Sequence, residues 1–109
     1  MSEIKNALIK HASITGADHG VLSAWLTLDY GGSGQNFGGY CLYSPIRDFR
    51  THGNYGGHFI HRCMEIAGVD KWENMVGKTI RVQCDWSKVE AIGHILKDDW
   101  FKPSEDYKE

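Results

Sequence analysis

The residues best suited to hold a small anion gather in one stretch near the middle of the chain. Arg47, Arg50 and His52 precede a glycine pair, Gly56-Gly57, and His58 follows it directly. The sequence after the glycines predicts a helix, whose first amide groups are unpaired and whose amino end carries partial positive charge. Arginine side chains add paired donors for phosphate oxygens. This stretch could hold a phosphate or pyrophosphate, and the alternative is a solvated basic loop.

The same region contains residue types that serve in metal and catalytic sites, but their spacing is incomplete. His58 and His61 are three residues apart, as metal ligands can be, yet no cysteine or carboxylate is placed to complete a set of three or four. Cys63 falls on the apolar side of the predicted helix, where a thiol is expected to be buried and unreactive. No serine sits in a nucleophile elbow, and no carboxylate pair stands out. We therefore expect no metal, no cofactor and no enzymatic activity.

A glycine-rich segment, GGSGQNFGG (31–39), resembles phosphate-binding loops only superficially. Those loops run from a strand into a helix. Here apolar and polar residues alternate before the glycines and a short apolar pattern resumes after them, which predicts a β-hairpin over Val21–Tyr43 with its turn at Gly31–Gly34. Gly38-Gly39 interrupt the returning strand, and such a break lets a ligand or another backbone come close.

Aromatic residues are more numerous than a small core requires. Trp25 occupies one of the alternate positions of its strand that are otherwise polar, so its ring should point away from the core. Further rings occur at Tyr40, Tyr43, Phe49, Tyr55, Trp100 and Phe101. Aromatic surface beside arginine suits a stacked base or a subunit interface. Several such rings indicate oligomerisation, ligand binding or both.

The elements that must position these residues fit one domain over residues 1–109. We predict strands over about 7–14, along both arms of the hairpin, and over 80–86 and 89–96. A long loop is predicted over 45–55, and the main helix should follow Gly56-Gly57 and end at Gly68. A short second helix over 71–76 would start at the capping pair Asp70 and Glu73 and end at Gly77, and the tail should fray from about residue 104. The predicted class is α+β: an antiparallel sheet of about five strands with the main helix and the short second helix packed on one face.

Charge and composition exclude several classes of function. Twelve Lys and Arg against fourteen Asp and Glu give a net charge of −2, which argues against binding of duplex nucleic acid. No apolar run approaches the roughly 20 residues of a membrane span, and no signal-peptide pattern opens the sequence. Cys41, Cys63 and Cys84 are odd in number and lie in apolar surroundings, so we expect reduced core cysteines of a cytoplasmic protein.

Three blocks of the sequence carry a resemblance to a known family. They are DHGVLSAWLTLDYGGSGQNFGGYCL (18–42), FIHRCMEIAGVDKWENMVGKTIRV (59–82) and AIGHILKDDWFKP (91–103), and together they cover most of the chain. In the order and spacing of DHG, YGGSGQNFGGY, GVDKWE, GKTIRV and IGHILKDDWF, the chain resembles the small phage proteins of the first Thoeris anti-defence group.

This resemblance implies a viral binding protein that sequesters a bacterial immune signal without degrading it. The family's ligands are cyclic ADP-ribose isomers, and some members also hold cyclic oligonucleotides at separate sites. Members form homodimers that assemble into hexamers, with the ligand in pockets between subunits. The implied location is the cytoplasm of the infected bacterial host.

Burying such a signal requires a stacking ring for the base, donors for the pyrophosphate and polar groups for the sugars. The predicted ligand-binding residues are Gln35, Asn36, Phe37, Tyr40, Arg47, Arg50, His58, Arg62 and Trp100. Phe37, Tyr40 or Trp100 would stack on the base, the arginines and the first helix amides would bind phosphate, and Gln35 or Asn36 would reach a ribose. Two alternatives stay open: a small phosphodiesterase or related hydrolase using His58, His61 or His94, and an oligomeric phage accessory protein without a small ligand.

Overall fold

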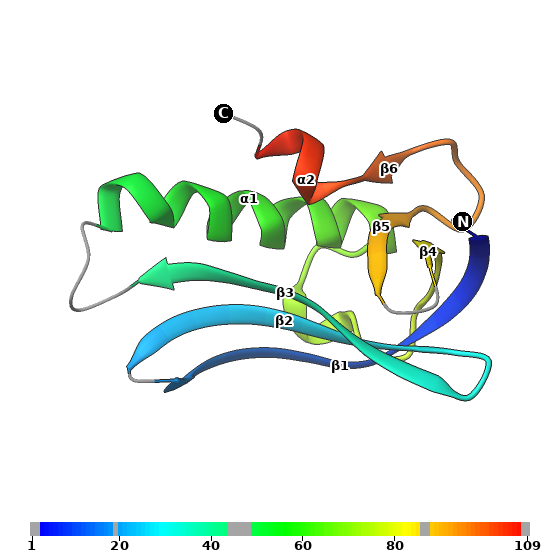
Figure 1. Cartoon of the computed structure of the whole chain (residues 1–109), viewed down its shortest axis with the longest axis horizontal. Coiled ribbons are helices and arrows are strands. Elements are labelled where there is room, and N and C mark those ends of the chain that lie inside the picture. The colour runs from blue at the N-terminus through cyan, green and yellow to red at the C-terminus, as the bar shows by residue number, and fades with distance from the viewer. Residues whose placement is uncertain (1–2, 19, 44–48, 86–87, 108–109) are drawn as a thin grey trace.

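The computed structural model describes residues 3–18, 20–43, 49–85 and 88–107 and has the predicted α+β fold (Figure 1). One antiparallel sheet has the strand order β3-β2-β1-β4-β5-β6, and the main helix α1 lies across one face of it. The elements in chain order are β1 (Glu3–Asp18), β2 (Val21–Tyr30), β3 (Ser33–Tyr43), α1 (Phe49–Ala67), the 3-10 turn η1 (Trp72–Asn74), β4 (Thr79–Cys84), β5 (Val89–Gly93), β6 (Trp100–Phe101) and α2 (Pro103–Asp106).

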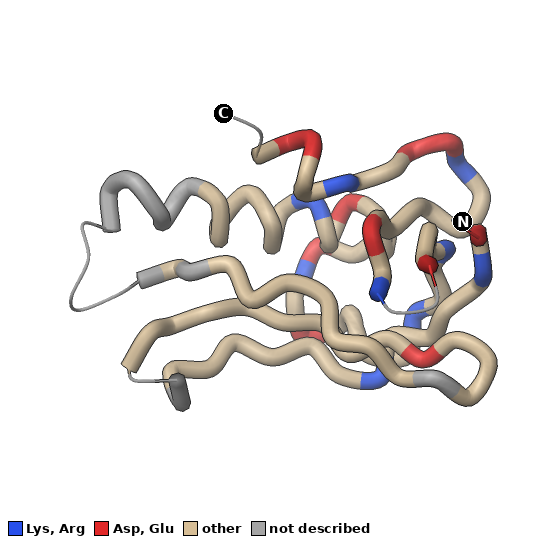
Figure 2. Tube along the Cα trace, in the orientation of Figure 1, with Lys and Arg blue, Asp and Glu red and all other residues tan. Residues whose placement is uncertain are grey.

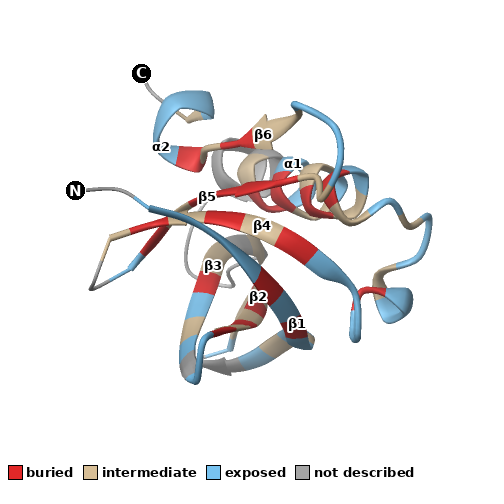
Figure 3. Cartoon of the chain, turned by 90° about the vertical axis from the view of Figure 1, so that its right-hand side faces the viewer, coloured by how far each residue is buried: buried red, intermediate tan, exposed pale blue. Residues whose placement is uncertain are grey.

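The core fills the space between the sheet and α1, and the alternation in β2 produces its central part. Ala24, Leu26 and Leu28 are fully buried, as their shared parity predicts. Phe59 and Cys63 on α1 are also fully buried and pack against this face. Figure 3 shows the same pattern as alternating buried and less buried residues along the strands. The predicted amphipathic helix and half-buried hairpin are therefore confirmed.

The hairpin turn is tighter than predicted. Tyr30 pairs with Ser33, so only Gly31 and Gly32 form the connection. Their φ angles are 68° and 83°, as two-residue turns of the type that matches strand twist require. Ser33 and Gly34, which we predicted in the turn, already belong to β3.

The main helix starts earlier than predicted. It spans Phe49–Ala67, so residues 49–55 of the predicted loop are helical and Gly56-Gly57 lie inside the helix. The sequence before the glycines lacks an apolar period, but a helix grows by adding one hydrogen bond per residue once its packed part has formed. Its carboxyl end agrees with the prediction, because Gly68 follows the last helical residue with φ 73°.

Several boundaries differ because local irregularities hid them. The first strand runs over Glu3–Asp18, not 7–14, and bulges between Ile9 and His11 and between Thr15 and Asp18 shift its parity, which explains its patchy alternation. β4 spans Thr79–Cys84, so it starts one residue earlier than predicted and leaves out Asp85, while residue 86 of the predicted strand lies outside the described residues. β5 ends at Gly93, not at residue 96. The sixth strand has only two residues, too few to show a period.

The second predicted helix and the tail also differ. Residues 71–76 contain only the turn η1, whose cap position is Lys71 and has no side-chain capping bond, so the predicted capping pair Asp70 and Glu73 is wrong. The short second helix is instead α2, in the tail that we expected to fray from about residue 104. Tyr107, directly after α2, packs against the core. This contact orders the tail, and local sequence propensity does not reveal it because the contact is made with distant residues.

Charged residues are distributed unevenly over the fold. Between Tyr30 and Ile46 the sequence contains no charged residue. In Figure 2 the Lys, Arg, Asp and Glu positions gather around β4, β5, β6 and the turns beside them, and β2 and β3 are almost free of them. The curvature of the sheet also brings β3 into contact with β5, although these strands are not neighbours in the sheet order. The uncharged strand β3 thus meets the charged part of the sheet at β5.

Candidate functional site

The meeting of β3 and β5 leaves a hollow, which we call the seam pocket. Its volume is about 450 Å³. Its walls include Asn36, Phe37 and Tyr40 of β3, Lys88 and Glu90 at the start of β5, and Lys102, Pro103 and Ser104 at the start of α2. Three of the predicted ligand-binding residues therefore lie together here, beside two lysines that the sequence analysis did not single out. A pocket of this size lies within the range of small-molecule sites.

The β3 wall supplies polar groups and rings of different accessibility. Thr27 donates a 3.1 Å hydrogen bond to Oδ1 of Asn36, which orients the Asn36 amide. Tyr40 is half-buried, its ring centroid is 5.2 Å from that of Phe59, and burial raises the pKa of its hydroxyl. Phe37 is only 5% exposed and stacks within the core at 5.7 Å from Phe59. Tyr40 therefore offers more surface to a ligand than Phe37 does.

The opposite wall supplies charge. Lys88 is exposed, and its backbone amide is held by Asp85 Oδ1 at 3.0 Å, which fixes the turn before β5. Lys102 is half-buried, and its Nζ lies 3.7 Å from Glu105 Oε1. Glu105 is largely exposed, so this ion pair is weak and leaves Lys102 able to accept another anion. Glu90 adds a carboxylate that suits sugar hydroxyls better than phosphate.

Those of the remaining predicted residues that the structure describes with their side chains do not line the seam pocket. Gln35 lies on β3 two residues before Phe37, outside the set of described residues that line the pocket. Arg47 lies outside the described residues, and Arg50 lies in the first turn of α1 with a side chain outside the described set. The part of the prediction that rests on these two arginines therefore stays a prediction.

Arg62, predicted to bind phosphate, is already held by two carboxylates of this chain. Its guanidinium donates to Glu65 and Asp99, both at 2.9 Å, and to the carbonyl oxygen of Trp100 at 3.0 Å. The hydrogen bond to Asp99 is the main cause of a raised pKa for Arg62, and the same bond lowers the pKa of Asp99. Arg62 ties α1 to the start of β6, and this pairing argues against a ligand contact.

Trp100, predicted to stack on a base, is covered by this chain. The Arg81 guanidinium lies 4.9 Å from the centroid of its ring, within cation–π range. The other neighbour is the backbone of Gly93, where an added Cβ would come within 2.6 Å of the ring. Arg81 also donates to the carbonyls of His94 and Lys97 at 2.8 and 2.7 Å. The indole thus belongs to a structural stack across β4, β5 and β6.

Of the two glycines predicted to let a ligand approach β3, Gly38 lines the seam pocket, and both also make room for rings of this chain. Gly38 and Gly39 have φ of 120° and 86°, at a bulge in β3. An added Cβ would come within 2.5 Å of the Phe59 ring at Gly38 and within 2.6 Å of the Trp25 ring at Gly39. The break in the strand therefore admits two rings of the same chain. Trp25 lies off the core face, as predicted, and donates to Ser23 Oγ at 3.2 Å.

The anion site predicted at the start of the helix is misplaced. Because α1 begins at Phe49, the amides at Gly56-Gly57 lie within the helix and not at its unpaired amino end. His58, in the second half of α1, has its Nδ1 3.0 Å from the Tyr107 hydroxyl and its Nε2 3.7 Å from Asp106 Oδ2. It contacts the tail of the chain and does not line the seam pocket.

The residues considered for catalysis are engaged within the fold. His61 Nε2 lies 3.4 Å from Glu65, and His94 Nδ1 accepts hydrogen bonds from the amides of Leu96 and Lys97 at 3.1 and 3.0 Å. Cys63 is fully buried, and burial raises the pKa of its thiol well above the usual value. Among the described residues, no group of three or more His, Cys, Asp or Glu side chains is arranged to hold a metal ion.

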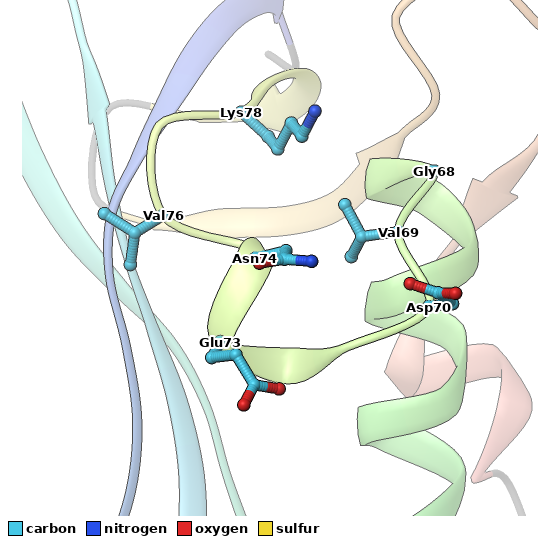
Figure 4. Close-up of a pocket in the computed structure, with 7 residues that line it drawn as sticks. All are labelled: Gly68, Val69, Asp70, Glu73, Asn74, Val76 and Lys78. Atoms are coloured by element: carbon cyan, nitrogen blue, oxygen red, sulfur yellow. The ribbon is translucent and has the colours of Figure 1, made fainter.

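A second hollow, about 760 Å³, lies between the end of α1 and the turn η1 (Figure 4). Its charged side chains are Asp70, Glu73 and Lys78. The two carboxylates outnumber the single lysine, which disfavours a pyrophosphate. None of the predicted ligand-binding residues whose side chains the structure describes lines it. The seam pocket is therefore the better candidate, although it is the smaller of the two.

Comparison with known proteins adds no assignment. No helix in the described part of the chain is long and apolar enough to cross a membrane. No protein-family model matches this sequence, and neither does any curated protein, so the resemblance to the Thoeris anti-defence group stays a prediction.

Proposed function

We propose that this protein binds a cyclic ADP-ribose-type signal in the seam pocket and sequesters it without hydrolysing it. The observation that carries the proposal is the pairing of Lys88 and Lys102 with Asn36 and Tyr40 around one hollow of about 450 Å³. Cations, a carboxamide and a ring are the groups that a pyrophosphate, its sugars and a base require.

The proposed contacts follow from the chemistry of the walls. Lys88 and Lys102 would neutralise the pyrophosphate as point charges, in place of the arginine forks expected from the sequence. The oriented amide of Asn36 and the carboxylate of Glu90 would bind ribose hydroxyls. Of the three rings predicted to stack on the base, Tyr40 is the one that is half-exposed beside the lysines.

Sequestration is favoured over hydrolysis by the positions of the histidines. A general base must lie within hydrogen-bond reach of the water or hydroxyl that it activates. His58, His61 and His94 are not among the residues that line the seam pocket, and each contacts another part of the same chain. A hydrolase remains the second candidate, and it predicts turnover of the bound signal.

The proposed assembly is a homo-oligomer, built from dimers and extending to a hexamer, in the cytoplasm of the infected host. Support comes from apolar side chains exposed on several elements: Ile4, Leu8, Ile14, Val76 and Leu96. Three of these residues, Ile4, Leu8 and Ile14, lie on one strand, β1, and apolar surface that is contiguous marks interfaces between subunits. An accessory protein without a small ligand would share this surface but would not bind the signal.

Calorimetry with cyclic ADP-ribose isomers tests the site. Lys88→Ala and Lys102→Ala should each weaken binding about tenfold, because a hydrogen bond to a charged group contributes roughly 1.5–3 kcal/mol and both sites are partly exposed. Lys78→Ala is the matched control, since Lys78 is an exposed lysine that lines the other hollow. If Lys78→Ala weakens binding and the other two variants do not, the hollow of Figure 4 holds the ligand.

The fate of the signal tests the class of function. The protein is incubated with the isomer, heated to unfold it, and the released nucleotide is analysed by mass. Intact isomer supports sequestration. A hydrolysed product would overturn the proposal in favour of the hydrolase, and no binding to any isomer would favour the accessory protein.

A further inference from the structure

The last described residues of the chain form a small docked segment, which we call the C-terminal strap (Pro103–Tyr107). Its short helix is closed by backbone bonds from Asp106 to Lys102 and from Tyr107 to Pro103, at 3.1 and 2.9 Å. Figure 1 shows α2 directly after β6, on the same side of the sheet as α1. The strap thus packs against the main helix near its middle and carries one large anchoring ring.

That ring is Tyr107, which inserts among rings from three other elements. Its centroid lies 4.9 Å from Tyr40 on β3, 4.7 Å from Tyr55 on α1 and 6.2 Å from Phe101 on β6. The His58 ring completes the cluster at 5.3 Å. Burial is the main cause of a raised pKa for the Tyr107 hydroxyl, so this group keeps its proton over the range in which proteins are stable.

The polar contacts of the strap meet at His58. The Tyr107 hydroxyl donates to the carbonyl oxygen of Tyr55 at 3.1 Å, and it lies 3.0 Å from His58 Nδ1. On the other side of the imidazole, Nε2 lies 3.7 Å from Asp106 Oδ2. Two residues of the strap therefore contact the two nitrogens of one histidine.

The number of protons on the imidazole decides how many of these contacts are satisfied. A neutral imidazole carries one N–H. With that proton on Nδ1, the ring presents a lone pair to the Asp106 carboxylate. With it on Nε2, the Tyr107 hydroxyl must turn its proton toward Nδ1 and away from Tyr55. The cation has both N–H groups, so it keeps the bonds through Tyr107 and adds a charge attraction to the Asp106 carboxylate at 3.7 Å.

Within the described part of the chain, the other groups near His58 add no further charge or hydrogen bond to the imidazole. Phe101 on β6 faces the imidazole with its ring at 5.8 Å, and Tyr40 on β3 reaches it only through Tyr107. Arg62, one turn further along α1, directs its guanidinium to Glu65 and Asp99. Asp106 is therefore the carboxylate that faces His58, among the residues that the structure describes.

The strap also forms part of the candidate site, because Pro103 and Ser104 line the seam pocket next to Lys102. We propose that the C-terminal strap is a pH-sensitive wall of this pocket, docked more firmly when His58 is protonated. The charge on the protonated imidazole attracts the Asp106 carboxylate, which holds the strap in its docked position.

The expected effect is modest, because the His58 and Asp106 side chains are 41% and 37% exposed. Ion pairs of such exposure change an equilibrium by about two- to fivefold. The readout is hydrogen exchange at the amides of Asp106 and Tyr107, expressed as protection relative to the unstructured rate at each pH. In the full-length protein, protection should rise about two- to fivefold between pH 8 and pH 5.5.

Two variants assign the effect. His58→Asn keeps an amide that can serve Tyr107 but does not titrate, and Asp106→Asn removes the partner carboxylate. Both should abolish the rise in protection, whereas amides of β2 (Val21–Tyr30), a strand paired on both sides, report whether the whole fold responds to pH. A rise that persists in full in Asp106→Asn, or no rise in the unmodified protein, would overturn the proposal. No ligand is used, so failure here leaves the proposed function standing.

Discussion

Replacing Gly38 with alanine should strongly destabilise the fold, although the change adds a single methyl group. Gly38 lies at the bulge of β3 with φ 120°, a conformation that L residues rarely adopt. Its added Cβ would lie 2.5 Å from Cζ of Phe59 and 2.8 Å from the carbonyl oxygen of Ala24. Neither neighbour can move freely, because Phe59 is fully buried and Ala24 is paired to strands on both sides, β1 and β3.

The magnitude follows from two contributions. A residue forced into a sparsely populated backbone region costs about 1–3 kcal/mol. Overpacking a filled core costs roughly another 1–3 kcal/mol. The sum, about 2–6 kcal/mol, is a large part of the 5–15 kcal/mol typical of a domain. For a domain near 100 residues the melting temperature should fall by at least about 10 °C.

Gly57→Ala is the matched control, and we expect the opposite sign. Gly57 is exposed inside α1, and an added Cβ meets nothing within 4 Å. Alanine should stabilise the helix by about 0.5–1 kcal/mol. Urea unfolding of both variants measures the difference. If Gly38→Ala unfolds within about 0.5 kcal/mol of the unmodified protein, the packing of Phe59 on the bulge is misread, since both contributions above would be missing.

Four further expectations follow from the same structure. Arg62→Ala should cost about 1–2 kcal/mol in urea unfolding, because the guanidinium is well buried but its two carboxylates can be hydrated. The hydrogen bond to Arg62 lowers the pKa of Asp99 in the fold, so this pairing stabilises the protein above about pH 4 and is lost as the pH falls. Asp99→Asn should therefore make the free energy of unfolding less dependent on pH in the acid range. An unchanged dependence would contradict this. Reducing agent should leave the melting temperature unchanged, since Cys63 and Cys84 are buried free thiols, and a loss would reveal a disulfide. Light scattering should show a homo-oligomer, and a clean monomer at micromolar concentration would contradict the proposed assembly.

The fold was largely predictable because its strongest signals are local. The alternation of Ala24, Leu26 and Leu28 and the helical period through Phe59 and Cys63 identify the buried faces that hold the sheet and helix together. The prediction failed where one residue breaks a period. Each bulge in β1 inserts a residue and flips the parity of everything beyond it, so a strand of 16 residues looked like one of eight.

The candidate site was less predictable, because it depends on which distant elements meet. Asn36, Phe37 and Tyr40 were singled out by residue type and do share one pocket. Lys88 and Lys102 carry no local signal, since one follows a turn and the other precedes a proline. They face β3 only because the curled sheet brings its two ends together. Arg62 and Trp100 were predicted to bind ligand because the sequence does not show their partners within the chain. Asp99 and Arg81, which contact them in the fold, lie on other elements or in the turns between them.

The charge distribution explains why the seam is a plausible place for an anion in a protein with a net charge of −2. The chain has no charged residue between Tyr30 and Ile46, so the β3 side of the pocket brings no carboxylate to oppose a phosphate. The lysines stand on the facing wall, and the half-buried Lys102 lies in a lower dielectric than an exposed lysine, where its attraction for an anion is stronger. Glu90 is the one carboxylate among the described lining residues. A carboxylate near two lysines disfavours ligands of very high negative charge. It favours a ligand that presents hydroxyl groups beside its phosphates, as a cyclic ADP-ribose does.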